Sequence, residues 1–597
     1  MSVTPKGLSI QAAYRDFADG KFRVNRTYQR KLVWTRDEKR RLIDSILRGF
    51  PIPLILLATE AEADGPKTFE ILDGMQRLNA IFEFIENHFE IDGKYFRVSE
   101  LARAKQRQEE GKFSLPIGNY ELLDKESCAN FVDYTLAVSD FPATDREAIN
   151  EVFGRINAYG RQLSNQEKRQ AGVVSQFSAL VRSLSAEIRG DVSRNTLDLS
   201  EMPSISIDPD DAKTTYGITA DETFWCYQGI LRKNQLREAE DEQFVADLVI
   251  SILNDEPFAF SGSNLDEYYR LDSKESIAIE RLISRRGAES LKGSILANLT
   301  LLLEFFRKVD DTQGAMKRVL NPDAGGNPIK APFYALFMAF YELCVEDERS
   351  PRDYQRIVAA VTNLQSKLTV ARGQTTANAR RGNIDLTKGL IDRYFDKRKP
   401  PSVSTGSGLG IRITNSLRRS KIETAAFETK QGILDLGQSR QENRKVLDDI
   451  IATICGIANI GPDSDGAVFV GVVDNETDAN RVATLDSITP VTVGARSVVG
   501  IDREAKILGI DLDAYVTRIA QAISKSGLSE PLKTSVLTRL DCVDYRGLSI
   551  LTIWVPTQNS FSTLDDEIYV RKGSSTEKPK GVTAMNAVQS LFEKRKS

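Results

Sequence analysis

The chain has few of the residues that most often build metal centres and cross-links. One histidine, His88, and five cysteines serve 597 residues. A single histidine excludes an HNH-type nuclease and a zinc site made of several histidines. The cysteines are widely scattered and odd in number, which argues against a disulfide framework and a zinc cluster. Any hydrolysis is therefore expected to depend on carboxylates and a metal ion instead of imidazole.

Long apolar runs and an excess of basic charge are also lacking. No stretch of about 18 apolar residues occurs, so no membrane span is expected. The first fourteen residues lack the basic-then-apolar pattern of a signal peptide, and we expect a cytosolic protein. Because the net charge is −4, any binding of nucleic acid must depend on local basic surface. No G-x-x-x-x-G-K-[ST] loop is present, so a P-loop ATPase has no support.

Length and patterning predict an α/β multidomain chain. At about 150 residues per domain, this length suggests three or four domains. Residues 171–396 show mostly helical periodicity, for example over 240–253 and 352–368, whereas the proline, glycine and aspartate of 203–219 predict a loop. Residues 397–410 pass from basic residues through Pro-Pro to glycine and serine, which predicts a flexible linker. Residues 411–597 alternate helix and strand patterns.

A strand, a glycine turn and a helix follow one another near the N-terminus. A predicted strand over residues 69–72 leads into Asp73-Gly74-Met75-Gln76-Arg77, and a helical pattern comes next. The first N–H groups of a helix lack partners, so this arrangement suits an anion, and Arg77 adds a planar donor. The alternative is an ordinary tight turn with a surface arginine. Upstream, a capping box is predicted at the residues Thr35 and Glu38.

Two flanking blocks make the turn more specific: Y-Q-R-K-L-V-W at 28–34, and V-F-G-R-I-N-A-Y-G at 152–160 with residues 163–169 after it. Together the three blocks, within residues 8–180, resemble the GmrSD-type N-terminal domain, a ParB/sulfiredoxin-related family with an (I/V)DGQQR turn. The resemblance implies a ParB-like α+β domain over residues 1–170 that binds, and often hydrolyses, a nucleoside triphosphate. Met75 replaces a glutamine of the family turn, so binding is expected more than hydrolysis. The implied nucleotide site consists of Asp73, Gly74, Gln76, Arg77, Arg155 and Asn157.

Acidic residues gather in the C-terminal region. The segment K-I-E-T-A-A-F-E-T-K-Q at 421–431 places Glu423, Glu428 and Lys430 close together, and the apolar run before Asp474 predicts a strand that ends on this acid. Carboxylates suit Mg²⁺ or Mn²⁺, and a lysine can offset charge that builds on a phosphate. Acids near strand ends are also common in purely structural roles, so this alternative stays open.

The order of these motifs resembles the Schlafen AlbA-type domain: the acid pair, a helix over 441–458, the strand, and Y-V-R-x-G-S-S-T at 569–576. Before the strand, residues 459–466 form a longer loop than the family's A-N-T-x-G-G. The resemblance implies an α/β domain over residues 411–597. It also implies a catalytic triad, Glu423, Glu428 and Asp474, that holds Mg²⁺ or Mn²⁺, with Lys430 at the scissile phosphate. Arg571 and Lys572 are expected to contact the flanking backbone.

These features predict a two-part nuclease of phage defence. The N-terminal domain would sense a nucleotide or a foreign nucleic acid, the helical region would relay the signal, and the C-terminal domain would cut. A basic strip with Arg372, Arg380 and Arg381 is expected to follow a nucleic-acid backbone, or else forms a solvated helix face. The alternatives are a non-catalytic nucleic-acid-binding regulator and an NTPase whose C-terminal domain only binds partners. DNA or RNA as substrate stays open, and a homo-oligomer is expected.

Overall fold

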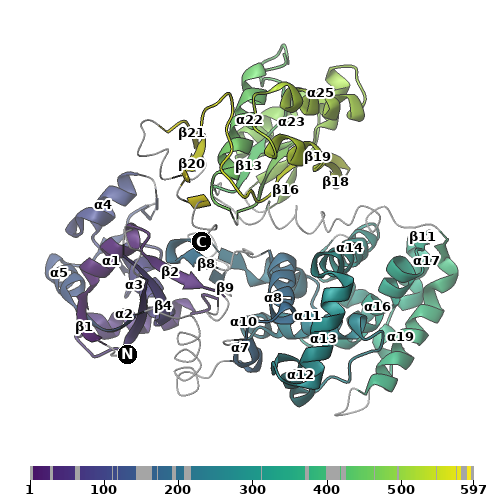
Figure 1. The fold of residues 1–597 in the computed structure, drawn as a ribbon, viewed down its shortest axis with the longest axis horizontal. Helices are drawn as coiled ribbons and strands as arrows, with labels where there is room; N and C mark the ends of the chain where they lie inside the picture. Colours follow the sequence, from purple (N-terminus) through teal and green to yellow (C-terminus); the bar gives the residue numbers. More distant parts are fainter. Residues whose placement is uncertain are drawn as a thin grey trace. The chain divides into compact units, whose positions relative to one another are not determined.

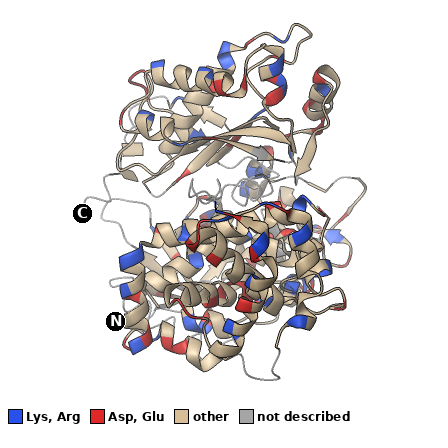
Figure 2. Ribbon diagram, turned by 90° about the vertical axis from the view of Figure 1, so that its right-hand side faces the viewer, with Lys and Arg blue, Asp and Glu red and all other residues tan. Residues whose placement is uncertain are grey.

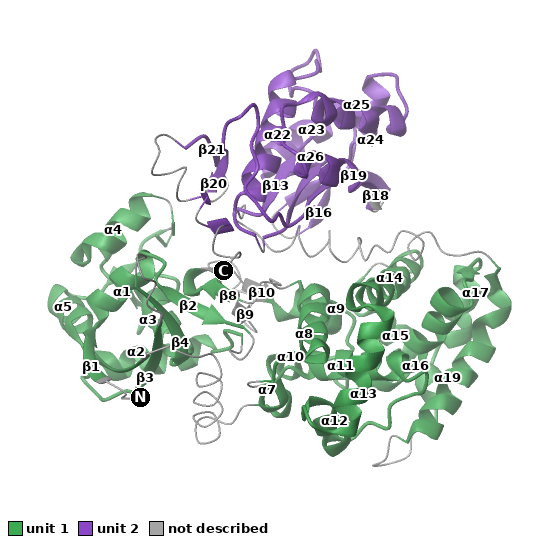
Figure 3. Cartoon of the chain, in the orientation of Figure 1, with its two compact units in different colours: residues 1–411 green, residues 412–597 purple. Residues whose placement is uncertain are grey.

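The computed structural model forms two compact units, Met1–Ile411 (unit 1) and Arg412–Ser597 (unit 2) (Figure 3). The parts expected as separate domains, residues 1–170 and 171–396, both belong to unit 1. The expected linker lies outside the described residues, apart from residue 397. The structure describes residues 4–26, 31–60, 67–110, 112–113, 115–116, 118–142, 164–170, 173–190, 196–202, 204–206, 217–310, 312–369, 376–397, 417, 425–462, 464–493, 496–545, 547–572, 575–579, 588–589 and 591–592.

A six-stranded mixed sheet organises the start of unit 1 (Figure 1). Its order is β1 (Thr4–Ser9), β7 (Thr135–Pro142), β3 (Ile55–Glu60), β4 (Thr68–Asp73), β2 (Phe22–Asn25) and β8 (Thr196–Asp198). The pairs β3–β7 and β2–β4 are parallel, and the other pairs are antiparallel. A pair of two-residue strands, β5 (Lys94–Tyr95) and β6 (Glu121–Leu122), lies apart from this sheet.

Helices bury the apolar side chains of this sheet in one core. They are α1 (Ile10–Ala18), α2 (Arg36–Leu47), α3 (Met75–Ile85), α4 (Ala102–Glu109) and α5 (Lys125–Asp133). Almost every residue of α3 is buried, which places this helix at the centre of the domain. The capping box predicted at the start of α2 is confirmed. The Thr35 hydroxyl accepts from the Glu38 N–H at 3.2 Å, and the Glu38 carboxylate accepts from the Thr35 N–H at 2.9 Å.

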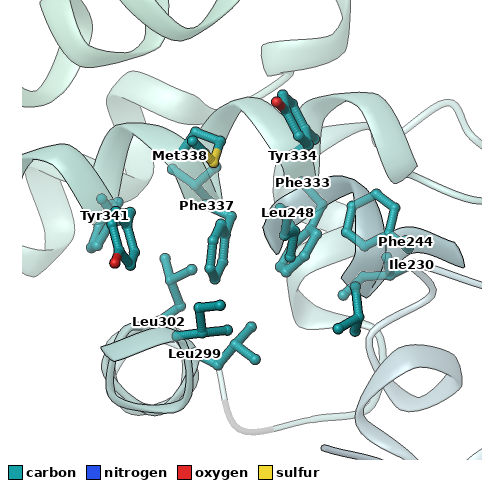
Figure 4. Close-up of a cluster of buried hydrophobic side chains, with 14 of the residues drawn as sticks. Ile230, Phe244, Leu248, Leu299, Leu302, Phe333, Tyr334, Phe337, Met338 and Tyr341 are labelled. Atoms are coloured by element: carbon teal, nitrogen blue, oxygen red, sulfur yellow. The ribbon is translucent and has the colours of Figure 1, made fainter. Parts of the chain in front are cut away.

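The rest of unit 1 is mainly helical. Its helices are α7 (Asn165–Gln170), α8 (Gln176–Arg189), α9 (Phe224–Tyr227), α10 (Lys233–Arg237), α11 (Glu240–Leu253), α12 (Gly262–Tyr269), α13 (Lys274–Arg286), α14 (Ala288–Arg307), α15 (Ala315–Leu320), α16 (Lys330–Tyr341), α17 (Tyr354–Val361), α18 (Leu364–Lys367) and α19 (Ala377–Ile391). Two short strands, β11 (Ser350–Pro351) and β12 (Phe395–Asp396), pair beside them. The helix α16 is apolar on nearly every side and forms the centre of the helical core. In Figure 4 its Phe337 points toward Leu299 and Leu302 of α14.

Two sequence predictions for this region were wrong in detail. The helix expected over residues 352–368 divides into α17 and α18, because Asn363 takes a left-handed conformation (φ 51°) between them. The stretch 203–219, expected as a loop, carries two short parallel strands, β9 (Ser204–Ser206) and β10 (Gly217–Thr219). Within the described part of the chain, none of the helices is long and apolar enough to cross a bilayer.

Unit 2 contains a four-stranded sheet of order β13 (Phe427–Lys430), β14 (Gly466–Val470), β19 (Leu548–Val555) and β18 (Leu540–Tyr545). Only β13 and β14 are parallel in it. Three helices cover one face: α22 (Arg444–Ala458), α25 (Leu512–Lys525) and α26 (Leu532–Leu537). A mixed helix-and-sheet, multidomain architecture is therefore confirmed.

A second, three-stranded sheet in unit 2 comprises β15 (Val472–Val473), β17 (Arg496–Val498) and β16 (Val491–Val493), with α23 (Glu476–Asp486) and α24 (Asp502–Ile507) nearby. The strands β20 (Val570–Lys572) and β21 (Ser575–Glu577) pair with each other. The strand expected before Asp474, over 466–473, is interrupted at Gly471, whose φ is 101°. A Cβ at this position would lie 3.1 Å from the Ser549 carbonyl oxygen and 3.2 Å from the Gly500 carbonyl carbon. This break sends the chain from the four-stranded sheet into the three-stranded sheet.

Candidate functional site

The turn between β4 and α3 forms as the sequence predicted. Gly74 takes a left-handed conformation (φ 96°) and begins the helix. A Cβ at this position would meet the Ile55 side chain at 2.9 Å, so both the backbone angle and the space require glycine. The Asp73 carboxylate accepts from the Gly74 N–H at 2.7 Å, which fixes the direction in which the chain enters the helix.

Arg77 and Asp73 form an ion pair across this turn. The Arg77 Nη2 atom lies 2.8 Å from Asp73 Oδ2 and donates to the Leu54 carbonyl at 2.9 Å. The side chain of Arg77 is 14% exposed, and that of Asp73 is 46% exposed. Among the described residues, Arg77 Nε has no hydrogen-bond partner. A guanidinium with unused donor capacity therefore stands beside an accessible carboxylate at the start of a helix.

Gln76, which was expected in the nucleotide site, forms its side-chain hydrogen bonds with the protein backbone. Its Oε1 atom accepts from the N–H groups of Val33 (3.0 Å) and Trp34 (3.2 Å), and its Nε2 atom donates to the Lys31 carbonyl at 2.7 Å. The residue is only 8% exposed. Gln76 thus clamps the segment 31–34 to the turn. Two further members of the expected site, Arg155 and Asn157, lie outside the described residues, and the nucleotide-binding roles stay a prediction.

In unit 2 the structure brings Glu428 and Lys430 together. They lie on the same face of β13 because side chains alternate along a strand, and Glu428 Oε1 is 2.7 Å from Lys430 Nζ. The other carboxylate oxygen, Oε2, is 2.9 Å from Arg571 Nη1. Glu428 is 6% exposed. Both of its oxygens therefore face cationic side chains.

Glu428 lies in the four-stranded sheet of unit 2, whereas Asp474 comes directly after a strand of the three-stranded sheet. Asp474 follows β15 in the three-stranded sheet, is exposed, and accepts from Asn475 Nδ2 at 2.9 Å. Glu423 lies outside the described residues. No group of three or more His, Cys, Asp or Glu side chains within the described ranges could hold a metal ion.

The described residues do not fit a Mg²⁺ or Mn²⁺ ion. Such an ion needs several oxygen atoms with free lone pairs, and the Glu428 carboxylate is already neutralised by Lys430 and Arg571. The metal triad stays a prediction that would require Glu428 to exchange these partners.

Arg571 lies inside unit 2. Its side chain is 1% exposed, and its guanidinium donates to the Ala425 carbonyl at 3.1 Å and to Thr576 Oγ1 at 2.9 Å. Its stem packs against α22 at Gly456, where a Cβ would lie 3.3 Å from Arg571 Cγ. Contact with a nucleic acid would require Arg571 to leave all of these partners. The side chain of Lys572 is not among the described ones.

The basic strip of unit 1 is paired where the structure describes it. Arg380 makes two contacts of 2.7 Å with the buried Asp247 and stacks over the Tyr334 ring. Burial raises the pKa of Asp247 above its usual range, even though Arg380 opposes this shift. Arg381 pairs with Glu342 at 2.6 Å and with Asp385 at 2.8 Å, and Arg372 lies outside the described residues. Figure 2 shows basic and acidic residues interspersed over the helices of both units.

Sequence reasoning missed a buried polar network beside β13. Glu504 accepts from the Ile433 N–H at 2.7 Å and from the Tyr515 hydroxyl at 2.6 Å. Gly432 is required there, because a Cβ would collide with the carboxylate of the buried Glu504. The partners are far apart in sequence, so no local pattern signals this network.

The comparisons with known proteins concern the N-terminal part of the chain. None of the curated proteins and none of the solved structures matches the chain. The resemblance of residues 411–597 to a Schlafen AlbA-type domain therefore stays a prediction. Residues 14–174 match the family model described as "GmrSD restriction endonuclease, N-terminal domain". This range contains the Asp73–Arg77 ion pair. The match supports the resemblance seen in the sequence: residues 14–174 are similar to the N-terminal domain of GmrSD restriction endonucleases.

Proposed function

We propose that this chain is a nuclease of phage defence, in which residues 14–174 bind a nucleoside triphosphate and unit 2 acts on DNA or RNA. The observation that carries the proposal is the turn with Asp73 and Arg77, within a region similar to the N-terminal domain of a restriction endonuclease. Restriction implies nucleic acid as the partner. Binding of a triphosphate, its regulatory role and a homo-oligomeric state are parts of the same proposal.

The turn supplies what a phosphate needs. The first N–H groups of α3 have no partners within the helix itself, and this end carries the positive end of the helix dipole. Gly74 adds no side chain that would keep a ligand away from this backbone. Arg77 would exchange its contact with Asp73 for the phosphate, since guanidinium groups bind both kinds of oxyanion. Met75 points into the apolar core and is buried, so it offers no polar group to a bound nucleotide. This supports binding without fast hydrolysis.

A binding experiment with a matched control tests the nucleotide part. Arg77→Ala removes the phosphate donor, and Arg48→Ala removes an arginine that likewise pairs with an aspartate four residues earlier in the chain, Asp44, at 2.8 Å. We expect calorimetry with ATP and GTP to show that Arg77→Ala lowers the binding affinity about tenfold or more, because one charge-assisted hydrogen bond contributes about 1.5–3 kcal/mol. Arg48→Ala should bind as the wild type does. Equal affinity of all three proteins would refute the site.

A cleavage experiment tests unit 2. The purified protein is incubated with DNA and with RNA in the presence of Mn²⁺ or Mg²⁺. Asp474→Asn is the informative variant, since this acid is exposed and its replacement leaves the core intact. Asp449→Asn, an exposed acid of α22, is the control. Cleavage that Asp474→Asn abolishes and Asp449→Asn preserves supports the triad, whereas cleavage by both variants removes Asp474 from it.

A second candidate is a non-catalytic unit 2 that only binds nucleic acid. The pairing of Glu428 with both Lys430 and Arg571 favours it, because a carboxylate neutralised in this way is a poor ligand for a metal ion. This candidate predicts that labelled nucleic acid is retained in a gel-shift assay with Mn²⁺ present and is recovered at its full length.

A further inference from the structure

The segment 31–34 joins the candidate nucleotide turn to the helical part of unit 1. On one side, Gln76 holds it through three hydrogen bonds, to the backbone of Lys31, Val33 and Trp34. Gln76 belongs to the first turn of α3 and directly precedes Arg77. A movement of this helix end would therefore reach the segment through the Gln76 side chain.

On its other side the segment is held by α10 and α11. Arg237 of α10 donates from Nε to the Val33 carbonyl at 3.1 Å, and its Nη2 lies 3.4 Å from Glu38 of α2. Lys31 Nζ is 2.7 Å from Glu242 Oε1 of α11. Val33 is therefore bound from two parts of unit 1: its N–H donates to Gln76 of α3, and its carbonyl accepts from Arg237 of α10.

A cluster of buried charges that includes Lys31 underlies this contact. Lys31 and Arg189 face Asp241 and Glu242, and all four side chains are buried. Burial favours the neutral form of Glu242, but the charges of Lys31 and Arg189 outweigh it and lower the pKa of Glu242 to about 2. Because each charge depends on its partners for compensation, Lys31 cannot withdraw without leaving an uncompensated buried anion. A displacement of the segment would therefore have to break the ion pair between Lys31 and Glu242.

We infer that residues 31–34 couple occupancy of the Asp73–Arg77 turn to the packing of α10 and α11. The inference rests on the proposed nucleotide binding and adds its route of regulation. A ligand that binds Arg77 displaces the first turn of α3. Gln76 transmits this displacement to residues 31–34, which Arg237 and Glu242 bind from the helical side. Coupling of this kind is reciprocal. A shift in the conformational equilibrium of α10 changes nucleotide affinity by the same factor by which the nucleotide changes that equilibrium.

Two measurements on the full chain test the inference. Arg237→Gln removes the α10 contact with Val33 without touching the turn. Arg232→Gln is the control, since Arg232 directly precedes α10 but binds Asn327 at 2.7 Å and the Gly326 carbonyl at 3.0 Å instead of the segment. Calorimetry with ATP and GTP gives the affinities, and hydrogen exchange of residues 233–253 with and without nucleotide reports the helices.

We expect nucleotide to slow amide exchange in α10 and α11 of the wild type, and Arg237→Gln to shift affinity at least threefold while Arg232→Gln leaves it unchanged. If Arg237 has a merely structural role, Arg237→Gln will have a changed thermal stability, but nucleotide will affect its amide exchange as it does in the wild type. If the wild type binds nucleotide, exchange in these helices does not respond and Arg237→Gln binds normally, the coupling is refuted while the binding proposal stands. If the wild type binds neither ATP nor GTP, both fail.

Discussion

Glu428 and Arg571 form a buried ion pair, with 2.9 Å between Oε2 and Nη1. The pair joins the edge strand β13 to β20. Arg571 also donates to Thr576 of β21, whose hydroxyl lies 3.0 Å from that of Thr453 in α22. Strand edges carry unpaired carbonyl groups, and Arg571 covers that of Ala425. An acid that the sequence suggested as a catalytic ligand thus has a structural partner.

Glu428→Gln is expected to destabilise unit 2 strongly. The change leaves the buried Arg571 without its counter-charge, and removal of one partner of a buried pair costs about 3–5 kcal/mol. The matched control is Glu442→Gln, which breaks the exposed Glu442–Arg518 pair (2.9 Å) and should cost less than about 1 kcal/mol. Hydrogen exchange of β13 amides in native protein measures both effects. Wild-type protection of β13 in Glu428→Gln would show that the pair does not hold the strand.

Gly74→Ala should be more harmful than an alanine at another left-handed glycine. Gly93 has φ 76° and open space around it, whereas a Cβ at Gly74 meets Ile55 at 2.9 Å. Backbone strain alone costs about 1–2 kcal/mol at either position, and the contact adds to it only at Gly74. Thermal unfolding should therefore give a lower Tm for Gly74→Ala than for Gly93→Ala. Equal values would mean that Ile55 moves aside freely.

The stability of unit 1 should fall in acid because of Glu242. Its pKa in the folded protein is lowered to about 2 from the ordinary value of 4.5. A group with a lowered pKa stabilises the fold fully above its unfolded value and loses this effect as the pH falls toward its folded value. The loss should thus develop between pH 4.5 and about 2 and amount to about 3 kcal/mol. Denaturant unfolding at several pH values measures it, and Glu242→Gln should show a shallower slope.

Two neighbouring arginines of α19 should respond very differently to replacement. Arg380→Met leaves the buried Asp247 uncompensated and is expected to cost about 3–5 kcal/mol. Arg381→Met breaks more exposed pairs with Glu342 and Asp385 and should cost about 1 kcal/mol or less. Denaturant midpoints of the two variants provide the comparison. Similar midpoints would mean that the Asp247 contact adds little stability.

Local elements followed well from the sequence. The helix α11 begins and ends at the predicted residues, Glu240 and Leu253, because its acidic first turn and apolar periodicity are local signals. The turn at Gly74 and the capping box at Thr35 also depend on residues a few positions apart. For the same reason the proximity of Glu428 and Lys430 was predictable, since residues two apart in a strand share a face.

Long-range relationships did not follow in the same way. The break at Gly471 depends on the approach of Ser549 and Gly500, and it places Glu428 and Asp474 in different sheets although both flank predicted strands. Gln76 belongs to a motif that suggests a ligand, yet it binds the segment 31–34 because packing brings this backbone within reach. Neither fact has a signature in the neighbouring residues.

The order of amino acids was thus enough to predict many of the local helices, strands and turns, because periodicity, capping and turn chemistry act over a few residues. Its motifs also pointed to the GmrSD-type resemblance within residues 8–180. The partners of the charged side chains were settled by folding. Burial removes water as the alternative partner, so Glu428, Arg571, Lys31 and Glu242 bind whichever opposite charges the packed elements bring beside them.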